Sequence, residues 1–176
     1  MKIKTGYTDS KRLFIAITLP ADFRVLLFKT IKDLARQDLA IRPVAPECIH
    51  LTLKFLGRTD LLKLREIMAA INDTAEAINS FSFTLGTIIG AFPEILSARI
   101  LFAPVEDTSG QIANLFNVLE NNLAKIKIKK EERKFTPHIT IARIKENLNI
   151  CTADLIKKIS LNFKGSVACS KITLFE

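Results

Sequence analysis

The stretch CIHLTLKFLG, residues 48–57, alternates polar and apolar side chains and ends at a glycine. An alternation with a period of two predicts a β-strand that buries one face. His50 and Thr52 point to the same face of this strand, because residues i and i+2 of a strand do so. Leu51 and Leu53 then point to the other face, toward a core. The stretch therefore predicts a rigid element that holds an imidazole beside a hydroxyl.

The same arrangement returns at HITIARI, residues 138–144, where His138 and Thr140 alternate with isoleucines. The chain contains two histidines, and both begin the pattern His-[Leu/Ile]-Thr-[Leu/Ile]. A single histidine in an apolar strand is usually a packed core or edge residue, but the recurrence favours a shared role. Half the length of the chain separates the two histidines, which indicates an architectural duplication.

Runs of β-branched and aromatic residues predict the other strands, and apolar residues at i, i+3 and i+4 predict the helices. Two prolines in RPVAPE, residues 42–47, predict a loop. The expected strands are 12–19, 48–57, 81–92, 97–105, 138–144 and 166–175, and the expected helices are 21–39, 60–78, 108–125 and 153–160. This mixed order predicts an α+β (mixed α/β) fold.

The domain organisation follows from the duplicated pattern. We expect a single bilobal domain over residues 12–176, preceded by a flexible N-terminal tail at residues 1–11. Its two pseudo-symmetric lobes would combine antiparallel-rich sheet with outer helices. Two such lobes facing each other would place both His-x-Thr motifs in one central cleft.

Composition limits the classes of function. The 176 residues are 48% hydrophobic and 25% charged, which is typical of a globular domain. A net charge of +8 would attract a polyanion such as RNA. The three cysteines are an odd number and lack metal-site spacing, so we expect a reducing, cytoplasmic location and no structural zinc. With no apolar run of 18 residues and no signal peptide, we expect no membrane association.

Two imidazoles and two hydroxyls on rigid strands suit phosphodiester hydrolysis. One neutral histidine can take a proton from water while one charged histidine gives a proton to the leaving oxygen. Histidine serves both roles because its unperturbed pKa of about 6.5 lies near working pH. Hydroxyl donors and a cation would stabilise the charge on the nonbridging oxygens. This chemistry requires neither a metal nor another cofactor.

Several stretches together carry a resemblance to a known family. They are RLFIAITLP (12–20), HLTLKFLG (50–57), GAFP (90–93) with SARILF (97–102), and TPHITIAR (136–143). In this order and spacing they resemble the RNA 2′,3′-cyclic phosphodiesterases, first named 2′-5′ RNA ligases (the LigT/ThpR group), of the two-histidine phosphoesterase superfamily. The resemblance extends over roughly residues 12–175. Phe102 stands where relatives often have tryptophan.

The resemblance implies a role for each motif residue. His50 and His138 would be the acid/base pair, with His50 favoured as the acid and His138 as the base. Thr52 and Thr140 would bind the phosphate, and Arg143 would clamp it. The implied reaction opens a terminal 2′,3′-cyclic phosphate to a 2′-phosphate. Its implied substrates are nucleotides and RNA ends, including the ends of tRNA fragments. A monomer is expected.

Arg143 conflicts with strict alternation, which places it on the strand face opposite His138. Its implied role therefore requires a bulge or the end of the strand to turn it back. The alternative is an ordinary surface arginine at a strand terminus.

Other residues near the motifs are candidates for substrate binding. Lys54 should share the face of His50 and Thr52 and so line the cleft. Phe55 and Phe135 could stack a base, although aromatic residues beside strands more often belong to the core. The basic segment KIKIKKEERK, residues 125–134, either grips RNA phosphates or forms a solvated surface.

Two other functions remain open from the sequence. The same residues could join tRNA halves through a 2′-5′ bond, which is the reverse chemistry. The chain could also be a noncatalytic RNA-binding module in which the basic loops matter and the histidines are incidental. Intact threonine and arginine partners at the motifs argue against the second alternative.

Overall fold

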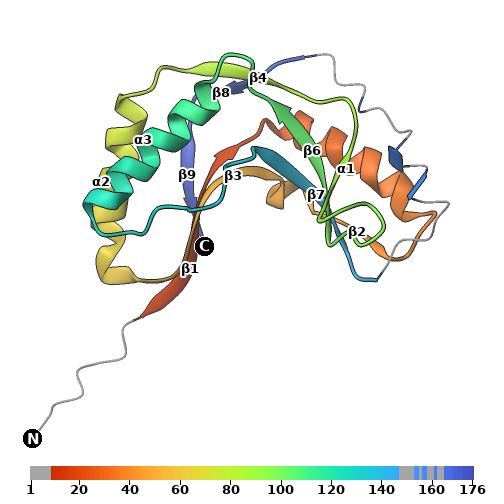
Figure 1. Cartoon of the computed structure of the whole chain (residues 1–176), viewed down its shortest axis with the longest axis horizontal. Helices are drawn as coiled ribbons and strands as arrows, with labels where there is room; N and C mark the ends of the chain where they lie inside the picture. Colours follow the sequence, from red (N-terminus) through yellow and green to blue (C-terminus); the bar gives the residue numbers. More distant parts are fainter. Residues whose placement is uncertain (1–8, 147–152, 155, 158–160, 162–164) are drawn as a thin grey trace, which may run out of the picture.

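The computed structural model describes residues 9–146, 153–154, 156–157, 161 and 165–176. In this part of the chain, nine antiparallel strands form one curled sheet (Figure 1). The strands are β1 (Ser10–Thr18), β2 (Ile41–Pro43), β3 (His50–Asp60), β4 (Phe81–Leu85), β5 (Gly90–Phe92), β6 (Ile100–Glu106), β7 (His138–Ile144), β8 (Val167–Cys169) and β9 (Ile172–Phe175). Their order is β8-β4-β6-β7-β3-β1-β9, with β2 paired to β7 and β5 paired to β6.

The α-helices that the structure describes over their whole length cover the sheet at its two ends: α1 (Ala21–Ala35), α2 (Leu64–Glu76) and α3 (Gln111–Lys125). Two short 3₁₀ helices, η1 (Pro46–Cys48) and η2 (Leu61–Lys63), precede β3 and α2. In Figure 1, α2 and α3 pack on each other near β9, and α1 lies at the other end against β2 and β7. Each helix buries one apolar stripe; that of α3 includes Ile112, Leu115, Leu119 and Leu123.

The core lies between the helices and one face of the sheet. Ile15 and Ile17 of β1, Leu51 of β3, and Ile139 and Ile141 of β7 have no exposed surface. Burying an aliphatic side chain of this size contributes about 1.5–3 kcal/mol. The strands are therefore fixed from one side, and their opposite face is available for polar groups.

Most predicted elements are present, with boundaries set by the tertiary structure. The helix predicted to reach residue 39 ends at Ala35, and Leu39 is 91% exposed rather than part of the apolar stripe. The Asp38 carboxylate accepts a hydrogen bond from the Ala40 backbone N–H, which begins a turn into β2. That strand was missed, because Arg42 and Pro43 lie in the segment predicted as a loop.

Two further differences concern the ends of the chain. The final predicted strand is split into β8, which pairs with β4, and β9, which pairs with β1. Ser10 and Lys11, expected in the tail, pair with Asp60 and Thr59 of β3. The tail residues 1–8 and half of the predicted helix at 153–160 lie outside the described residues, and the four described residues of that helix, at 153–154 and 156–157, are helical. No helix among the described residues has the length and apolar character needed to cross a membrane.

Candidate active site

The two motif strands are neighbours in the middle of the sheet. β3 and β7 run antiparallel and are paired at Leu51 and Ile139. Both side chains are fully buried, so they mark the face of the sheet that contacts the core. The residues on either side of them point to the opposite face.

Continuing this register places His50 opposite Thr140, and Thr52 opposite His138. Side chains opposite each other in an antiparallel pair share a face, so all four lie together on the side away from the core. The two imidazoles are diagonal neighbours across the paired residues. Diagonal neighbours have Cα atoms about 7–8 Å apart, which leaves room for a group bound between the rings.

Two phenylalanines enclose the His50 ring. Phe14 of β1 and Phe175 of β9 are direct partners across the strands, with stacked rings whose centroids are 5.0 Å apart. The His50 centroid lies 4.8 Å from that of Phe14 and 5.6 Å from that of Phe175. Burial lowers the pKa of His50 below its ordinary value of 6.5, and a hydrogen bond to the Cys48 backbone opposes this shift. The environment thus favours the neutral ring.

A second phenylalanine pair contacts the His138 ring. Phe92 of β5 and Phe102 of β6 stack with centroids 4.5 Å apart, and both meet the His138 ring edge-to-face. The His138 Nδ1 lies 2.9 Å from the Thr136 carbonyl oxygen. Because a carbonyl only accepts, this hydrogen bond places the proton on Nδ1 of the neutral ring and leaves Nε2 free for proton transfer.

The duplication inferred from the motifs therefore extends to their surroundings. Each histidine contacts a stacked phenylalanine pair, and one member of each pair comes from the strand beside the motif strand. Sequence reasoning missed Phe14, Phe92 and Phe175, because their contacts depend on which distant strands pair. The sequence does hold a glycine, Gly90, at the position opposite Phe102. A Cβ atom at Gly90 would overlap the Phe102 ring, so only a glycine fits opposite that aromatic side chain.

A β-bulge brings Arg143 to the side of the histidines. Phe102 pairs with Thr140 and Leu101 with Ala142, so Ile141 is the extra residue in β7. The extra residue reverses the alternation, and the exposed Arg143 returns to the face of Thr140. The bulge that the implied role of Arg143 required is present.

A second bulge moves Lys54 to the other face. Ala16 pairs with Thr52 and Ile15 with Lys54, so Leu53 is the extra residue in β3. Lys54 consequently points to the core beside Ile15, and the prediction that it shares the face of His50 was wrong, although Lys54 does line the cleft that contains Thr52 and His138. Its Nζ lies 2.8 Å from Oε1 of the buried Glu120 and donates a 2.8 Å hydrogen bond to the Lys129 carbonyl.

The same bulge places Phe55 on the histidine face. Phe55 is the cross-strand partner of Phe14, and the two ring centroids are 6.0 Å apart. The Phe55 side chain is 72% exposed, which is unusual for a large apolar group and leaves its ring accessible to a ligand.

Thr52 and His138 both line a cleft of about 400 Å³. Phe135 lines it as well and stacks on Phe116 of α3, with ring centroids 4.1 Å apart and ring planes within 2°. The cleft thus combines apolar walls with a charged side; the phenylalanines are Phe55, Phe92, Phe116 and Phe135, and the charged residues are Lys54, Lys134, Arg133 and Glu131, the last two of which form an ion pair.

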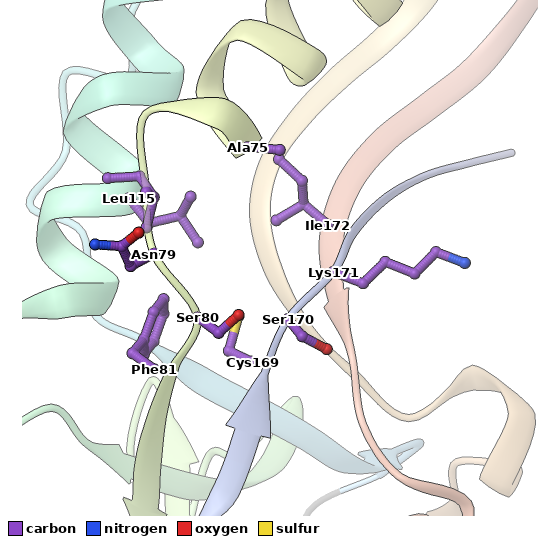
Figure 2. Close-up of a pocket in the computed structure, with 10 residues that line it drawn as sticks. Ala75, Asn79, Ser80, Phe81, Leu115, Cys169, Ser170, Lys171 and Ile172 are labelled. Carbon is purple, nitrogen blue, oxygen red and sulfur yellow. The ribbon is translucent and has the colours of Figure 1, made fainter.

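A separate pocket of about 120 Å³ lies where the segment after α2 faces β8 and β9 (Figure 2). Ala75, Leu115 and Ile172 give it an apolar lining. Burial raises the pKa of the Cys169 thiol to about 11, so this thiol is protonated and unreactive at neutral pH. None of the lining residues belongs to the two motifs, and the pocket is not the candidate active site.

Comparison with known proteins identifies the family. A family model described as the 2′-5′ RNA ligase superfamily matches residues 28–176. The chain belongs to the 2′-5′ RNA ligase superfamily. A superfamily relative from Thermotoga maritima, named RNA 2′,3′-cyclic phosphodiesterase, is 35% identical over 76% of this chain and 70% of its own length. An Escherichia coli K12 relative of the same name is 32% identical over 77% of this chain and 73% of its own length.

Solved structures from the superfamily share the fold. TT0787 of Thermus thermophilus matches with a TM-score of 0.77 and 26% identity, covering 93% of this chain and 87% of that one. LigT of E. coli complexed with 3′-AMP matches with a TM-score of 0.66 and 27% identity, covering 94% and 87%. The resemblance inferred from the motifs and the α+β fold class are both confirmed.

Proposed function

We propose that this chain is an RNA 2′,3′-cyclic phosphodiesterase, which opens a terminal 2′,3′-cyclic phosphate and leaves a 2′-phosphate. The observation that carries the proposal is the pairing of β3 and β7, which sets two imidazoles and two hydroxyls on one face. The names of the T. maritima and E. coli relatives support it.

The reaction needs one proton taken and one proton given. The oxygen of a water molecule attacks phosphorus as one histidine takes its proton, and the bond from phosphorus to O3′ breaks as the other histidine protonates O3′. The Thr52 and Thr140 hydroxyls donate to the nonbridging oxygens. Arg143, which the bulge returns to this face, offsets their charge.

The surroundings of the rings favour His50 as the base and His138 as the acid, the reverse of the assignment preferred from the sequence. The phenylalanines around His50 disfavour its charged form, and a base must be neutral before it accepts a proton. His138 has its Nδ1–H held by the Thr136 carbonyl, and it would act as the acid in its charged form, in which Nε2 also carries a proton.

The cleft beside the motifs suits a nucleoside. The exposed Phe55 ring and the stacked Phe135 offer flat apolar surfaces for a base, and Lys134 offers a cation for a phosphate backbone. The proposed substrates are RNA ends and nucleotides with a 2′,3′-cyclic phosphate, tRNA fragments among them. We place this activity in a cytoplasmic monomer that needs no metal.

The identity of the product tests the function. A trinucleotide that ends in a 2′,3′-cyclic phosphate is incubated with the enzyme in the presence of a chelator, and the product is assigned by ³¹P NMR. We expect a 2′-phosphate from the wild type and unchanged substrate with His138→Ala. The surface variant Arg36→Ala, at an exposed ion pair with Asp33, serves as the control and keeps activity. A 3′-phosphate product, or no hydrolysis, would contradict the proposal.

Ligation is the second candidate, because the family itself is described as 2′-5′ RNA ligases. Its chemistry runs through the same residues in reverse. Incubation with split tRNA halves, one of which carries the cyclic phosphate, compares the joined product with the hydrolysed end. A dominant joined product would favour the ligase, and RNA binding that yields neither product would favour a noncatalytic module.

A further inference from the structure

Two arginines lie directly opposite each other, one in the motif strand β7 and one in its neighbour β2. Arg42 of β2 and Arg143 of β7 are cross-strand partners, and both are exposed. The neighbouring pair, Ile41 and Ile144, is buried. Alternation therefore sends both guanidinium groups to the face opposite the core, which is the face of the histidines.

No counter-ion for this pair lies among the residues that the structure describes. Like charges directly opposite each other in a sheet are destabilising. Among the described residues, neither guanidinium has an ion-pair or hydrogen-bond partner. The residues that the structure does not describe include no Asp or Glu, so they cannot provide a carboxylate side chain to either arginine. The repulsion is thus left for an external anion to relieve.

The arginine pair lies on the same face as His138 and Thr140, further along β7. β2 and β3 both lie on the edge of β7 that faces away from β6. Arg143 is three residues after Thr140, a distance of about 10 Å at about 3.3 Å per residue and less across the bulge. An anion bound by Arg42, the cross-strand partner of Arg143, would therefore sit beside the reacting phosphate and remain distinct from it.

We propose that Arg42 binds a second phosphate, that of the internucleotide linkage 5′ of the cyclic end, beside Arg143, which serves the reacting phosphate. This rests on the proposed function. A cyclic phosphate carries one negative charge, which one guanidinium offsets, so the second cation matches a second phosphate. The planar fork of arginine suits two phosphate oxygens at once. Arg42 thereby selects oligonucleotide ends over mononucleotides.

The test compares two substrates that differ in the second phosphate: ApApA ending in a 2′,3′-cyclic phosphate, and adenosine 2′,3′-cyclic phosphate. We expect Arg42→Gln to raise KM for the trinucleotide about tenfold at nearly constant kcat. For the mononucleotide, kcat/KM should stay within about twofold of the wild type. Arg42→Lys should recover part of the loss, and Arg36→Gln should change neither substrate.

A binding measurement separates this proposal from the proposed function. The affinity for fluorescent ApApA with a 3′-phosphate is measured by anisotropy, which requires no hydrolysis. We expect Arg42→Gln to weaken binding about tenfold and to lower the slope of log affinity against log salt by about one. An equal loss for both cyclic substrates would assign Arg42 to the reacting phosphate and overturn the proposal. No loss of trinucleotide affinity would overturn it as well, whether or not the wild type is active.

Discussion

At the scale of single residues, the main asymmetry of the site lies in the two histidines. His50 is enclosed by Phe14 and Phe175, whereas His138 meets its phenylalanines edge-on and is tied to the Thr136 carbonyl. Contact with apolar rings removes water from His50, and this loss of hydration disfavours the charged imidazolium. Two residues of the same type can therefore take different roles because their surroundings differ.

This asymmetry predicts the pH dependence of the reaction. A base is lost as pH falls through its pKa, so the lowered pKa of His50 should place the acidic limb of kcat/KM below pH 6.5. Phe175→Ala opens His50 to water and should move this limb upward, toward 6.5. The measurement is kcat/KM between pH 4.5 and 9, with Phe92→Ala, beside the other histidine, as the matched control. If Phe175→Ala instead moves the alkaline limb, His50 is the acid and the assignment is reversed.

Gly90 gives a second prediction at this scale, through the position of Phe102. Alanine at this position would push on the Phe102 ring, which contacts His138. We expect Gly90→Ala to lower kcat by roughly 10–100-fold, since small displacements of catalytic groups have effects of this size. Gly165→Ala is the control, because a Cβ there meets open space. Unchanged kcat in Gly90→Ala would contradict the role given to the Phe102 ring.

At the scale of elements, two bulges determine which side chains reach the cleft. The bulge in β7 brings Arg143 to the histidine face, and the bulge in β3 sends Lys54 to the core and Phe55 to the cleft. Buried Lys54 then holds the basic segment, residues 125–134, in place. Lys54 donates a hydrogen bond to the Lys129 carbonyl. Its ion-pair partner Glu120 accepts a hydrogen bond of 2.7 Å from the Glu131 backbone N–H. The segment beside the cleft is thus held to β3 and α3.

This buried ion pair should matter more for stability than any surface pair. Glu120→Leu leaves the Lys54 charge buried without a partner, and we expect it to lower the free energy of unfolding by about 3–5 kcal/mol. The double variant Lys54→Met/Glu120→Leu removes both charges and should recover much of that loss. Glu132→Ala, at an exposed pair with Lys129, should cost about 0–1 kcal/mol. Urea unfolding measures all three, and a double variant no more stable than Glu120→Leu would contradict this account.

The bulges also mark the limit of prediction from sequence. The alternation in 48–57 and 138–144 was enough to predict both motif strands and the faces of their histidines and threonines. It failed at Lys54, because the bulge at Leu53 arises from pairing with β1 and has no local signature in LTLK. For Arg143 the need for a bulge could be predicted, but only the pairing with β6 locates it at Ile141.

At the scale of the whole molecule, the two copies of the motif belong to one continuous sheet. Both copies lie on central neighbouring strands, β3 and β7, of one sheet with helices at its ends. The phenylalanine pairs could not be predicted, since Phe175 and Phe92 reach the histidines through β9 and β5, whose places in the sheet depend on distant pairing. The division of the last predicted strand into β8 and β9 could not be predicted either, because β8 pairs with β4 and β9 pairs with β1, both far away in the sequence.

Joint action of the two histidines is the central claim, and a mutant cycle tests it most directly. Hydrolysis of a trinucleotide 2′,3′-cyclic phosphate is measured for the wild type, His50→Ala, His138→Ala and the double variant, with thermal unfolding to show that each folds. We expect each single variant to lose about 10²–10⁴-fold in kcat, and the double variant to lose little more than either one, because the pair acts as a unit. Full activity in either single variant, with the fold intact, would contradict the account.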